Sequence, residues 1–385
     1  MSDHFDIGSS GLLSKPMLDE MLLWAEGMGY SDIYLMSGSP VHGKLHKEVN
    51  PITKTPLRGS GFSELIEYLY HETGTAVIQD KGYIDTNYSI IDDYDKEYRF
   101  RVSVTAVEAP SGIAQGYQIV LRVVDSDIQS TESLGLTPTM VHPFKSGVGI
   151  GLVTGKTNSG KTTTCASILK EIIQSMRVHI ITFESPIETS FHHVENKKAL
   201  VVQSESPRDI KEYDDAVGNS LRRSPDYVYF SELRTKNIIN AAITEASTGH
   251  FVVGTLHTNT LANTFARVAA EYPDDSRKAV IMKFLSVVSV IIHQELYPKV
   301  GGGLIAIREC LTFTIKIKEI LAERLLQSPT GDIEADIDEL VSSRGESFVA
   351  NAKKAFDKGL IDGETYQLIC FQRGVINPHL EAMGG

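Results

Sequence analysis

The first third of the chain alternates short helical and strand patterns of hydrophobic and polar residues. Hydrophobic residues recur with helical spacing over Met17–Met28 and Phe62–His71, and Ser31–Gly38 reads as a short strand that ends in a turn. Strict alternation, which is typical of half-buried antiparallel strands, covers three later runs: Thr86–Ile91, Glu97–Val107 and Tyr117–Val124. These patterns predict a small α+β domain over residues 1–125.

From Gly147 onward the pattern changes to strands that are each followed by a helix. A polar stretch over residues 126–140 indicates a linker before this change. Short hydrophobic runs predict strands at 148–154, 178–183, 227–230, 250–255 and 304–308. Helical spacing predicts helices at 163–173, 236–247 and 261–270. Such alternation is typical of a doubly wound α/β sheet, and it predicts a second domain core over residues 141–310.

The most hydrophobic stretch with helical spacing, Ala279–Leu296, is interrupted by Lys283 and His293. We expect it to be a buried helix rather than a membrane span, because these two polar side chains lie within it. The last part of the chain, residues 311–385, is predicted to be a mostly helical region. Its candidate helices are Ile315–Leu326, Ile333–Val341, Ser347–Lys358 and Gly363–Phe371.

The overall composition excludes some classes of protein but does not identify one. A chain of 385 residues is long enough for two domains with separate cores. Its net charge of −12 disfavours a protein whose main task is to grip bare nucleic acid, since such proteins usually present a basic face. The first residues show no basic segment followed by a hydrophobic one, so we expect no signal peptide. The three scattered cysteines predict reduced, packed thiols in a cytosolic protein and no metal site.

The stretch Gly155–Thr162 carries the strongest chemical signal. It reads G-x-x-x-x-G-K-T between a strand pattern and a helix pattern, which is the context of a phosphate-binding P-loop. Glycines let backbone N–H groups fold around an anion, and the helix N-terminus adds partial positive charge. Lys161 is placed to reach the β- and γ-phosphates, and the Thr162 hydroxyl to ligate Mg²⁺. The predicted ATP-binding residues are Gly155, Thr157, Asn158, Ser159, Gly160, Lys161, Thr162 and Thr163.

Two glutamates stand where strands of the predicted sheet end. Glu184 follows the strand at 178–183, and Glu232 follows the strand at 227–230. Both carboxylates would lie at the carboxyl edge of a parallel sheet, where doubly wound folds bind ligands. One could order Mg²⁺ through water, and the other could accept a proton from the attacking water. The residues alone leave this assignment open, and a surface salt bridge is the simpler alternative for each acid.

Histidines and arginines supply further candidates. His257 follows the strand at 250–255 and could donate a hydrogen bond to a γ-phosphate, whereas His250 precedes the same strand at its opposite end. Arg99 and Arg101 lie two residues apart on one strand of the small domain, and Arg122 lies on another. These arginines either form a solvated sheet face or stabilise transition-state charge at a neighbouring active site. Both interpretations remain open at this point.

The order of these motifs resembles that of the secretion and traffic ATPase superfamily, which includes PilT-type retraction motors and the type II and type IV secretion ATPases. The P-loop is similar to the family's Walker A motif. Three further segments are similar to the family's other motifs. Thr182–Glu188 resembles its Asp box, Phe230–Arg234 its Walker B motif, and the pair Thr248–His250 and Thr255–Thr258 its His box. Some details look closest to the DotB and plasmid conjugation TraJ branch: Val201–Glu205, Leu221–Pro225 and Ile307–Glu309.

The resemblance implies a RecA-like P-loop domain, a smaller N-terminal PAS-like α+β domain and a helical C-terminal part. It implies an ATPase motor that forms a homohexameric ring. Such a ring would be cytoplasmic, peripherally associated with the inner membrane, and would power a type IV secretion, conjugation or type IV pilus apparatus. Its partners would be components of that apparatus. The transported substrate could be a pilin, an effector protein or a DNA–protein complex, and the sequence leaves this choice open.

The resemblance also implies roles for the candidate residues. Glu184 matches the Asp-box glutamate and would polarise the attacking water, and Glu232 matches the Walker B glutamate near Mg²⁺. His257 and His250 match the His box, with His257 as the expected γ-phosphate sensor. The arginines that match those presented to ATP by the small domain are Arg99, Arg101 and Arg122.

Three positions depart from the family pattern. Ser185 stands where the Asp box usually has aspartate, Ser231 replaces the usual Walker B glycine, and Thr235 replaces an aspartate. Because the candidate carboxylates are retained, we expect activity. The three substitutions change the residues around those carboxylates, and slow turnover would be consistent with them. Two alternatives stay open: a P-loop ring motor that nucleic acid stimulates, and a nucleotide-binding assembly scaffold with little turnover. A small-molecule kinase is disfavoured because no substrate lid is evident.

Overall fold

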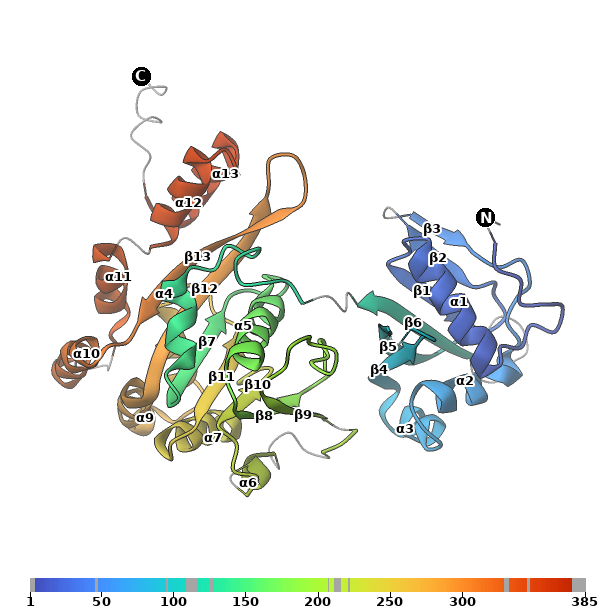
Figure 1. The fold of residues 1–385 in the computed structure, drawn as a ribbon, viewed down its shortest axis with the longest axis horizontal. Helices are drawn as coiled ribbons and strands as arrows, with labels where there is room; N and C mark the ends of the chain where they lie inside the picture. Colours follow the sequence, from blue (N-terminus) through green and yellow to red (C-terminus); the bar gives the residue numbers. More distant parts are fainter. Residues whose placement is uncertain are drawn as a thin grey trace. The chain divides into compact units, whose positions relative to one another are not determined.

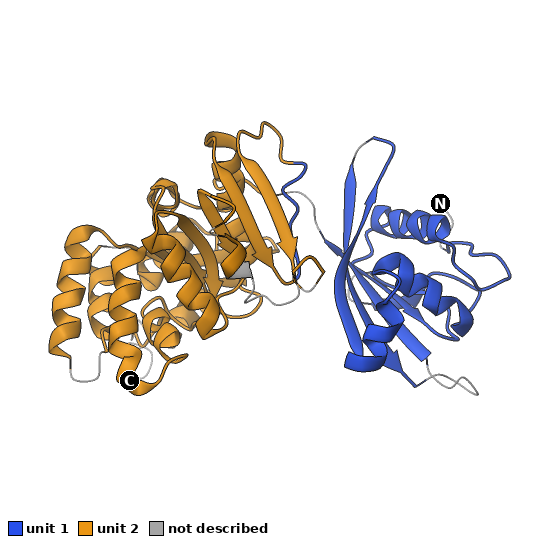
Figure 2. Ribbon diagram, turned by 90° about the horizontal axis from the view of Figure 1, so that it is seen from below, with its two compact units in different colours: residues 1–127, 186–193 blue, residues 128–185, 194–385 orange. Residues whose placement is uncertain are grey.

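The chain folds into two compact units in this computed structural model (Figure 2). Unit 1 contains residues 1–127 and 186–193, and unit 2 contains residues 128–185 and 194–385. The backbone therefore passes from one unit to the other three times, after Asp127, Ser185 and His193. Part of the predicted linker, residues 126 and 127, lies outside the described residues. Leu221, the first residue of the stretch Leu221–Pro225, does so too. The described residues are 4–45, 48–94, 96–108, 116–124, 128–206, 208–210, 216–220, 222–328, 332–344 and 347–375.

Unit 1 is built on a six-stranded antiparallel sheet with the strand order β3-β2-β1-β6-β5-β4 (Figure 1). Its strands are β1 (Asp32–Met36), β2 (His42–Leu45), β3 (Glu48–Pro51), β4 (Tyr83–Ile91), β5 (Glu97–Val107) and β6 (Gly116–Val124). Its helices are α1 (Lys15–Gly27), α2 (Phe62–Leu69), α3 (Gly74–Lys81) and the short 3₁₀ turn η1 (Gly59–Gly61). The predicted strands and the first two helices are confirmed, and β2, β3 and α3 were not predicted.

The helices of unit 1 pack against the sheet through side chains at helical spacing. The Ser14 hydroxyl caps α1 by accepting a hydrogen bond from the backbone of Met17, and a proline follows in the first turn. One face of α1 then buries Leu18 and Leu22 in the same cluster that holds Phe100 of β5. The alternation read from β4 and β5 therefore places their hydrophobic side chains in this core.

Unit 2 contains a seven-stranded mixed sheet with the strand order β13-β12-β7-β11-β10-β8-β9. All neighbouring pairs are parallel except β12 with β13, which is antiparallel. Its strands are β7 (Gly149–Thr154), β8 (His179–Glu184), β9 (Leu200–Glu205), β10 (Tyr227–Phe230), β11 (Phe251–Leu256), β12 (Val288–Pro298) and β13 (Leu304–Thr312). Its first helices are α4 (Pro138–Val141), the 3₁₀ turn η2 (His142–Lys145), α5 (Lys161–Ser175), α6 (Ala216–Ser220), α7 (Lys236–Ser247) and α8 (Asn263–Ala269).

The predicted single helix over Ala279–Leu296 is wrong. The chain forms the helix α9 (Asp274–Val287) and then turns into β12, which runs between β7 and β13. The physical reason is the run of β-branched residues that begins at Val288, which favours a strand and can pair on both sides. α9 is amphipathic, with Lys283 and Ser286 exposed, and the hydrophobic residues of the buried β12 continue its spacing across the boundary.

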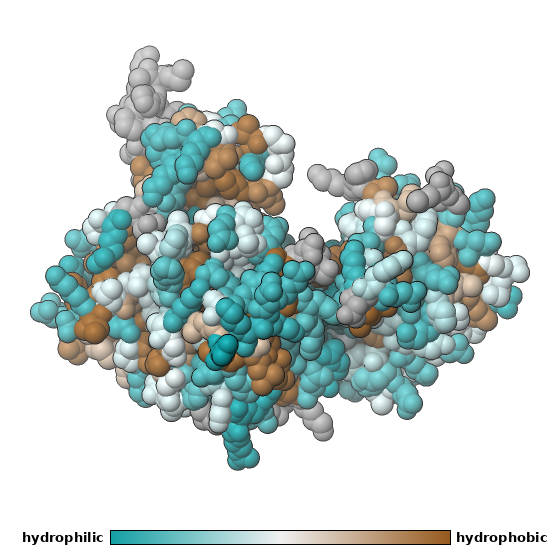
Figure 3. All heavy atoms as spheres, in the orientation of Figure 1, coloured by the Kyte–Doolittle hydropathy of each residue, from teal (hydrophilic) through white to brown (hydrophobic). Residues whose placement is uncertain are grey.

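The remaining helices belong to the C-terminal part of the chain. They are α10 (Ile315–Gln327), α11 (Glu334–Ser343), α12 (Phe348–Asp357) and α13 (Gly363–Gln372), which confirms the predicted helical region. α10 joins the main core of unit 2, whereas α12 and α13 form a smaller cluster with the ends of β12 and β13. The helices α12 and α13 also expose some hydrophobic side chains to solvent. Figure 3 shows hydrophobic residues gathered on that part of the surface. Among the described residues, no helix has the length and hydrophobicity needed to span a bilayer.

Candidate active site

The P-loop lies between β7 and α5, as the sequence predicts. Gly155 has φ 147° and Gly160 has φ 80°, and both are values that side-chain-bearing residues rarely adopt. A Cβ atom on Gly155 would lie 2.3 Å from the backbone oxygen of Gln294 on β12, so the loop also needs glycine for space. The structure thereby places residues 155–163 in one loop and the first turn of one helix. This geometry matches a backbone cradle for phosphate groups.

Lys161 folds back over the loop from the first position of α5. Its ammonium donates hydrogen bonds to the backbone oxygens of Gly155 (3.0 Å) and Lys156 (2.8 Å), and it lies 3.4 Å from Nδ1 of His257. The residue is only 7% exposed. A buried cation is therefore held at the centre of the loop, where a polyphosphate chain would be neutralised.

Glu232 and His257 extend this group of contacts along the carboxyl edge of the sheet. Nε2 of His257 lies 3.5 Å from the Glu232 carboxylate, which also accepts a hydrogen bond from Nε of Arg234 at 2.7 Å. Partial burial and the nearby Lys161 ammonium lower the pKa of His257 below its ordinary value. A chain of close contacts thus runs from Lys161 through His257 to Glu232.

Glu184 lies at the end of β8, on the same edge of the sheet. The strand register pairs Phe183 with Phe230 and Phe230 with Gly254, so β8, β10 and β11 end side by side. The Glu184 carboxylate is 2% exposed and accepts hydrogen bonds from Thr182 (2.6 Å) and Gln203 (2.9 Å). These two neutral donors fix the orientation of a buried acid at the edge where the P-loop begins.

His250 lies elsewhere in unit 2. It precedes β11, at the amino edge of the sheet, and the P-loop lies at the carboxyl edge. Its ring is 3.1 Å from the carboxylate of Glu245, which is fully buried and accepts a hydrogen bond from Ser220. The structure therefore does not bring His250 together with Lys161 and His257 within this chain.

The three candidate arginines belong to unit 1, where each contacts another residue of that unit. Arg99 is buried and donates to the backbone oxygen of Ile187 at 3.3 Å, and Arg101 lies 3.4 Å from the carboxylate of Glu188. Both partners belong to the segment 186–193, which follows Glu184 in the chain. Arg122 pairs with Asp32 at 2.7 Å. Arg99 therefore contacts the backbone, and Arg101 a side chain, of the segment that continues from a candidate catalytic acid.

Comparison with known proteins yields a consistent assignment. Residues 85–303 match the family described as Type II/IV secretion system protein. The type IV pilus retraction ATPase PilT of Pseudomonas aeruginosa is 31% identical over 80% of this chain and 85% of its own length. The chain belongs to the type II/IV secretion ATPase superfamily.

Solved structures of this superfamily agree with the fold. The Legionella pneumophila ATPase DotB is 30% identical with a TM-score of 0.86, covering 95% of this chain and 98% of that one. The pilus retraction motor PilT with bound ADP is 29% identical with a TM-score of 0.78, covering 91% and 96%. The expected RecA-like ATPase domain with an N-terminal domain is confirmed. This secretion ATPase is a motor enzyme of the secretion and pilus class.

Sequence reasoning missed the residues that support the P-loop of this ATPase from β12 and β13. The Gln294 carboxamide donates to the backbone oxygen of Ser159 (2.6 Å) and accepts from Thr164 (2.8 Å) and Arg308 (3.1 Å). Arg308 is nearly buried and also donates to the backbone oxygen of Leu134 at 2.7 Å. The one sequence signal for Gln294 is that a polar residue stands within a hydrophobic strand. This signal was missed because the stretch was interpreted as a single helix.

Glu295, next along β12, is a second supporting residue. Its carboxylate lies 3.1 Å from the Arg373 guanidinium, 3.4 Å from the Lys156 ammonium and 3.7 Å from Nε2 of His293. The His293 ring, the Arg373 guanidinium and the Lys156 ammonium together lower the pKa of Glu295 to about 2. The ionised carboxylate is therefore bound more strongly in the folded state than in the unfolded chain.

This pKa predicts how Glu295 contributes to acid stability. Because the pKa falls from 4.5 to about 2, the unfolded chain binds the proton more readily. The stabilisation, about 3 kcal/mol, should be complete above about pH 5 and should be lost as the pH falls toward 2. Urea unfolding of wild type and Glu295→Gln should give a difference that falls to roughly half by about pH 3. A difference that is constant from pH 7 to pH 3 would contradict the prediction.

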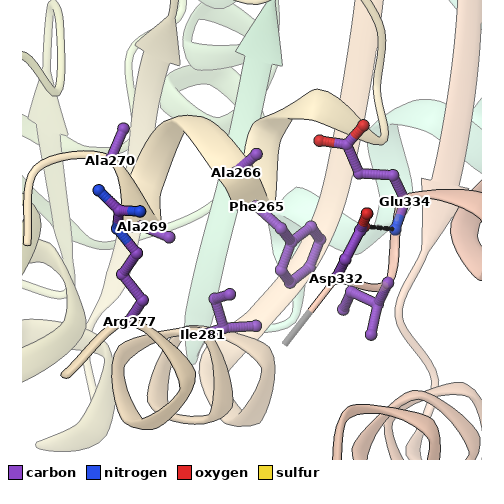
Figure 4. Close-up of a pocket in the computed structure, with 9 residues that line it drawn as sticks. Phe265, Ala266, Ala269, Ala270, Arg277, Ile281, Asp332 and Glu334 are labelled. Atoms are coloured by element: carbon purple, nitrogen blue, oxygen red, sulfur yellow. Dashed lines mark hydrogen bonds between the residues drawn. The ribbon is translucent and has the colours of Figure 1, made fainter. Parts of the chain in front are cut away.

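A separate pocket of about 280 Å³ lies between α8, α9 and the start of α11 (Figure 4). Its wall is hydrophobic, with Phe265 and Ile281, and its rim carries Arg277 and Glu334. These rim charges already have partners, because Arg277 pairs with an aspartate of its own helix and Glu334 accepts from Asn263 at 2.8 Å. The pocket is lined by residues other than those of the P-loop.

Proposed function

We propose that this chain is an ATP-hydrolysing hexameric motor that powers a type IV secretion, conjugative transfer or type IV pilus apparatus. It would dock on the cytoplasmic side of the inner membrane. The observation that carries the proposal is the line of contacts from Lys161 through His257 to Glu232, within 3.5 Å at each step, beside a P-loop. The likeness to PilT and DotB over nearly the whole chain supports it.

The donor set fits a bound magnesium ion. The Thr162 hydroxyl and the Glu232 carboxylate are hard oxygen ligands of the kind Mg²⁺ prefers, and both stand at the edge where phosphates would bind. These two residues would hold the ion, directly or through water. When bound, Mg²⁺ would neutralise charge that develops on the phosphate oxygens.

The other candidate residues then take distinct roles. Lys161 would neutralise the β- and γ-phosphates, and the N–H groups of residues 155–163 would surround them. Glu184, which accepts hydrogen bonds from Thr182 and Gln203, is the proposed general base, whereas Glu232, which contacts Arg234 and His257, would lie beside the Mg²⁺ ion. His257, whose lowered pKa keeps the ring neutral near pH 7, would donate a hydrogen bond to the γ-phosphate.

Hexamer formation and turnover are tested together. The purified chain with ATP and Mg²⁺ should assemble into particles of six times the chain mass and should release phosphate, as measured by mass photometry and a phosphate assay. Activity per chain should rise with protein concentration, because ring assembly would precede turnover. A monomer that is fully active at every concentration would contradict the ring. Strong stimulation by single-stranded DNA would instead favour a nucleic-acid motor.

A further inference from the structure

Arg373 connects the C-terminal helices with two loops of the nucleotide site. It follows directly after α13, and its side chain is 13% exposed. The guanidinium carbon lies 4.0 Å from the centre of the Phe348 ring on α12, so a cation–π contact helps to hold its position. Both ends of the guanidinium then contact residues of other elements.

The first contact reaches the P-loop through one carboxylate. Nη2 of Arg373 lies 3.1 Å from Glu295, whose second oxygen is 3.4 Å from the ammonium of Lys156. Lys156 follows Gly155 in the loop, and its backbone oxygen accepts the 2.8 Å hydrogen bond from Lys161. One carboxylate therefore joins Arg373 to a loop residue that also holds Lys161.

The second contact reaches the loop that carries His257. Nη1 of Arg373 donates to the backbone oxygen of Asn259 at 3.3 Å, two residues after His257. The same nitrogen lies 3.9 Å from Glu309 of β13, whose carboxylate accepts from the backbone N–H of Leu261 at 2.9 Å. Arg373 and Glu309 therefore both contact the backbone of the segment 259–261, which follows His257 in the chain.

We propose that Arg373 is a positioning residue for ATP hydrolysis, through which α13 holds the P-loop and the His257 loop in register with each other. The proposal rests on the ATPase activity of this chain and adds a role for its C-terminal helices. An arginine suits this position because its planar fork makes several directed hydrogen bonds at once, which a lysine ammonium on a flexible stem does not reproduce. Small displacements of residues around a reacting centre reduce rates steeply.

The test compares three variants with wild type in steady-state ATP hydrolysis. Arg373→Met should lower kcat roughly tenfold, since the carbonyl of Asn259 loses its donor and His257 shifts. Arg373→Lys should recover part of this loss. The control Arg324→Met removes an exposed arginine from α10 that pairs with Asp336, away from both loops, and its kcat should stay within about twofold of wild type. All rates are measured on protein that is shown to be folded by its melting curve.

A second measurement follows hydrogen exchange in α13. Because α13 contacts both nucleotide loops through Arg373, we expect nucleotide binding to stabilise α13 in turn. ADP should therefore slow hydrogen exchange of the α13 amides in wild type, with a weaker effect in Arg373→Met. Unchanged kcat and KM in a folded Arg373→Met enzyme, with α13 exchange indifferent to ADP, would overturn the proposal. An inactive wild-type enzyme would overturn the proposed function instead.

Discussion

Replacing Lys161 by alanine should abolish ATP hydrolysis, with a loss on the order of a thousandfold or more in rate. The ammonium of Lys161 is buried, and its present acceptors are two backbone oxygens of the P-loop. Lys156, the other lysine of the loop, is exposed and pairs with Glu295. Removing Lys161 leaves the negative charge of the phosphates without its nearest cation.

The measurement is phosphate release by purified protein, with ADP affinity measured by calorimetry as a second readout. Lys198→Ala is the matched control, because Lys198 is an exposed lysine outside the loop. The control should hydrolyse ATP at the wild-type rate. If Lys161→Ala kept substantial activity, the P-loop would not be the site of hydrolysis and the proposed mechanism would have to be abandoned.

Exchanging Glu184 for glutamine should lower kcat by a factor on the order of 10² to 10⁴ while nucleotide binding is retained. Glutamine keeps the size of the side chain and an oxygen that can accept from Thr182 and Gln203, so the fold around it should survive. What it loses is the ability to take a proton from water. A nucleotide-binding scaffold, by contrast, would show little phosphate release in either form.

Single-turnover hydrolysis separates this chemical effect from product release. The control is Glu195→Gln, since Glu195 is an exposed acid further along the same stretch of chain. Equal rates for wild type and Glu184→Gln would exclude Glu184 as the base and leave Glu232 as the remaining candidate.

Most of the fold could be predicted because period-two and helical patterns stay local in the chain. Short strands were the exception, since β2 and β3 carry few hydrophobic residues of their own and form by pairing with neighbours. The hydrophobic run of β9 covers only Leu200–Val202, and this edge strand forms by pairing with β8. β12 was misread because this buried strand has no alternating polar face and follows directly on the hydrophobic residues of α9, and sheet pairing decided its conformation.

The candidate site could be predicted as far as strand ends define it. In a parallel sheet the residues after each strand gather at one edge, which is why Glu232 and His257 meet near Lys161. Gln294 and Arg373 could not be found in this way, because they act across contacts between distant parts of the sequence. His250 shows the limit of motif matching, since a residue in the right motif lies at the other edge.

The segment 186–193 has a practical meaning for dissecting the enzyme. A fragment that stops at Asp127 would lack this segment, so the buried side chains of Ile187 and Phe191 would be missing from unit 1. Asn87 would also lose its acceptor, the backbone oxygen of Ile187 at 2.7 Å. Only Ser185 separates this segment from Glu184. Truncation at the linker therefore yields an incomplete small unit, because its missing segment returns to it only after Glu184 in the chain.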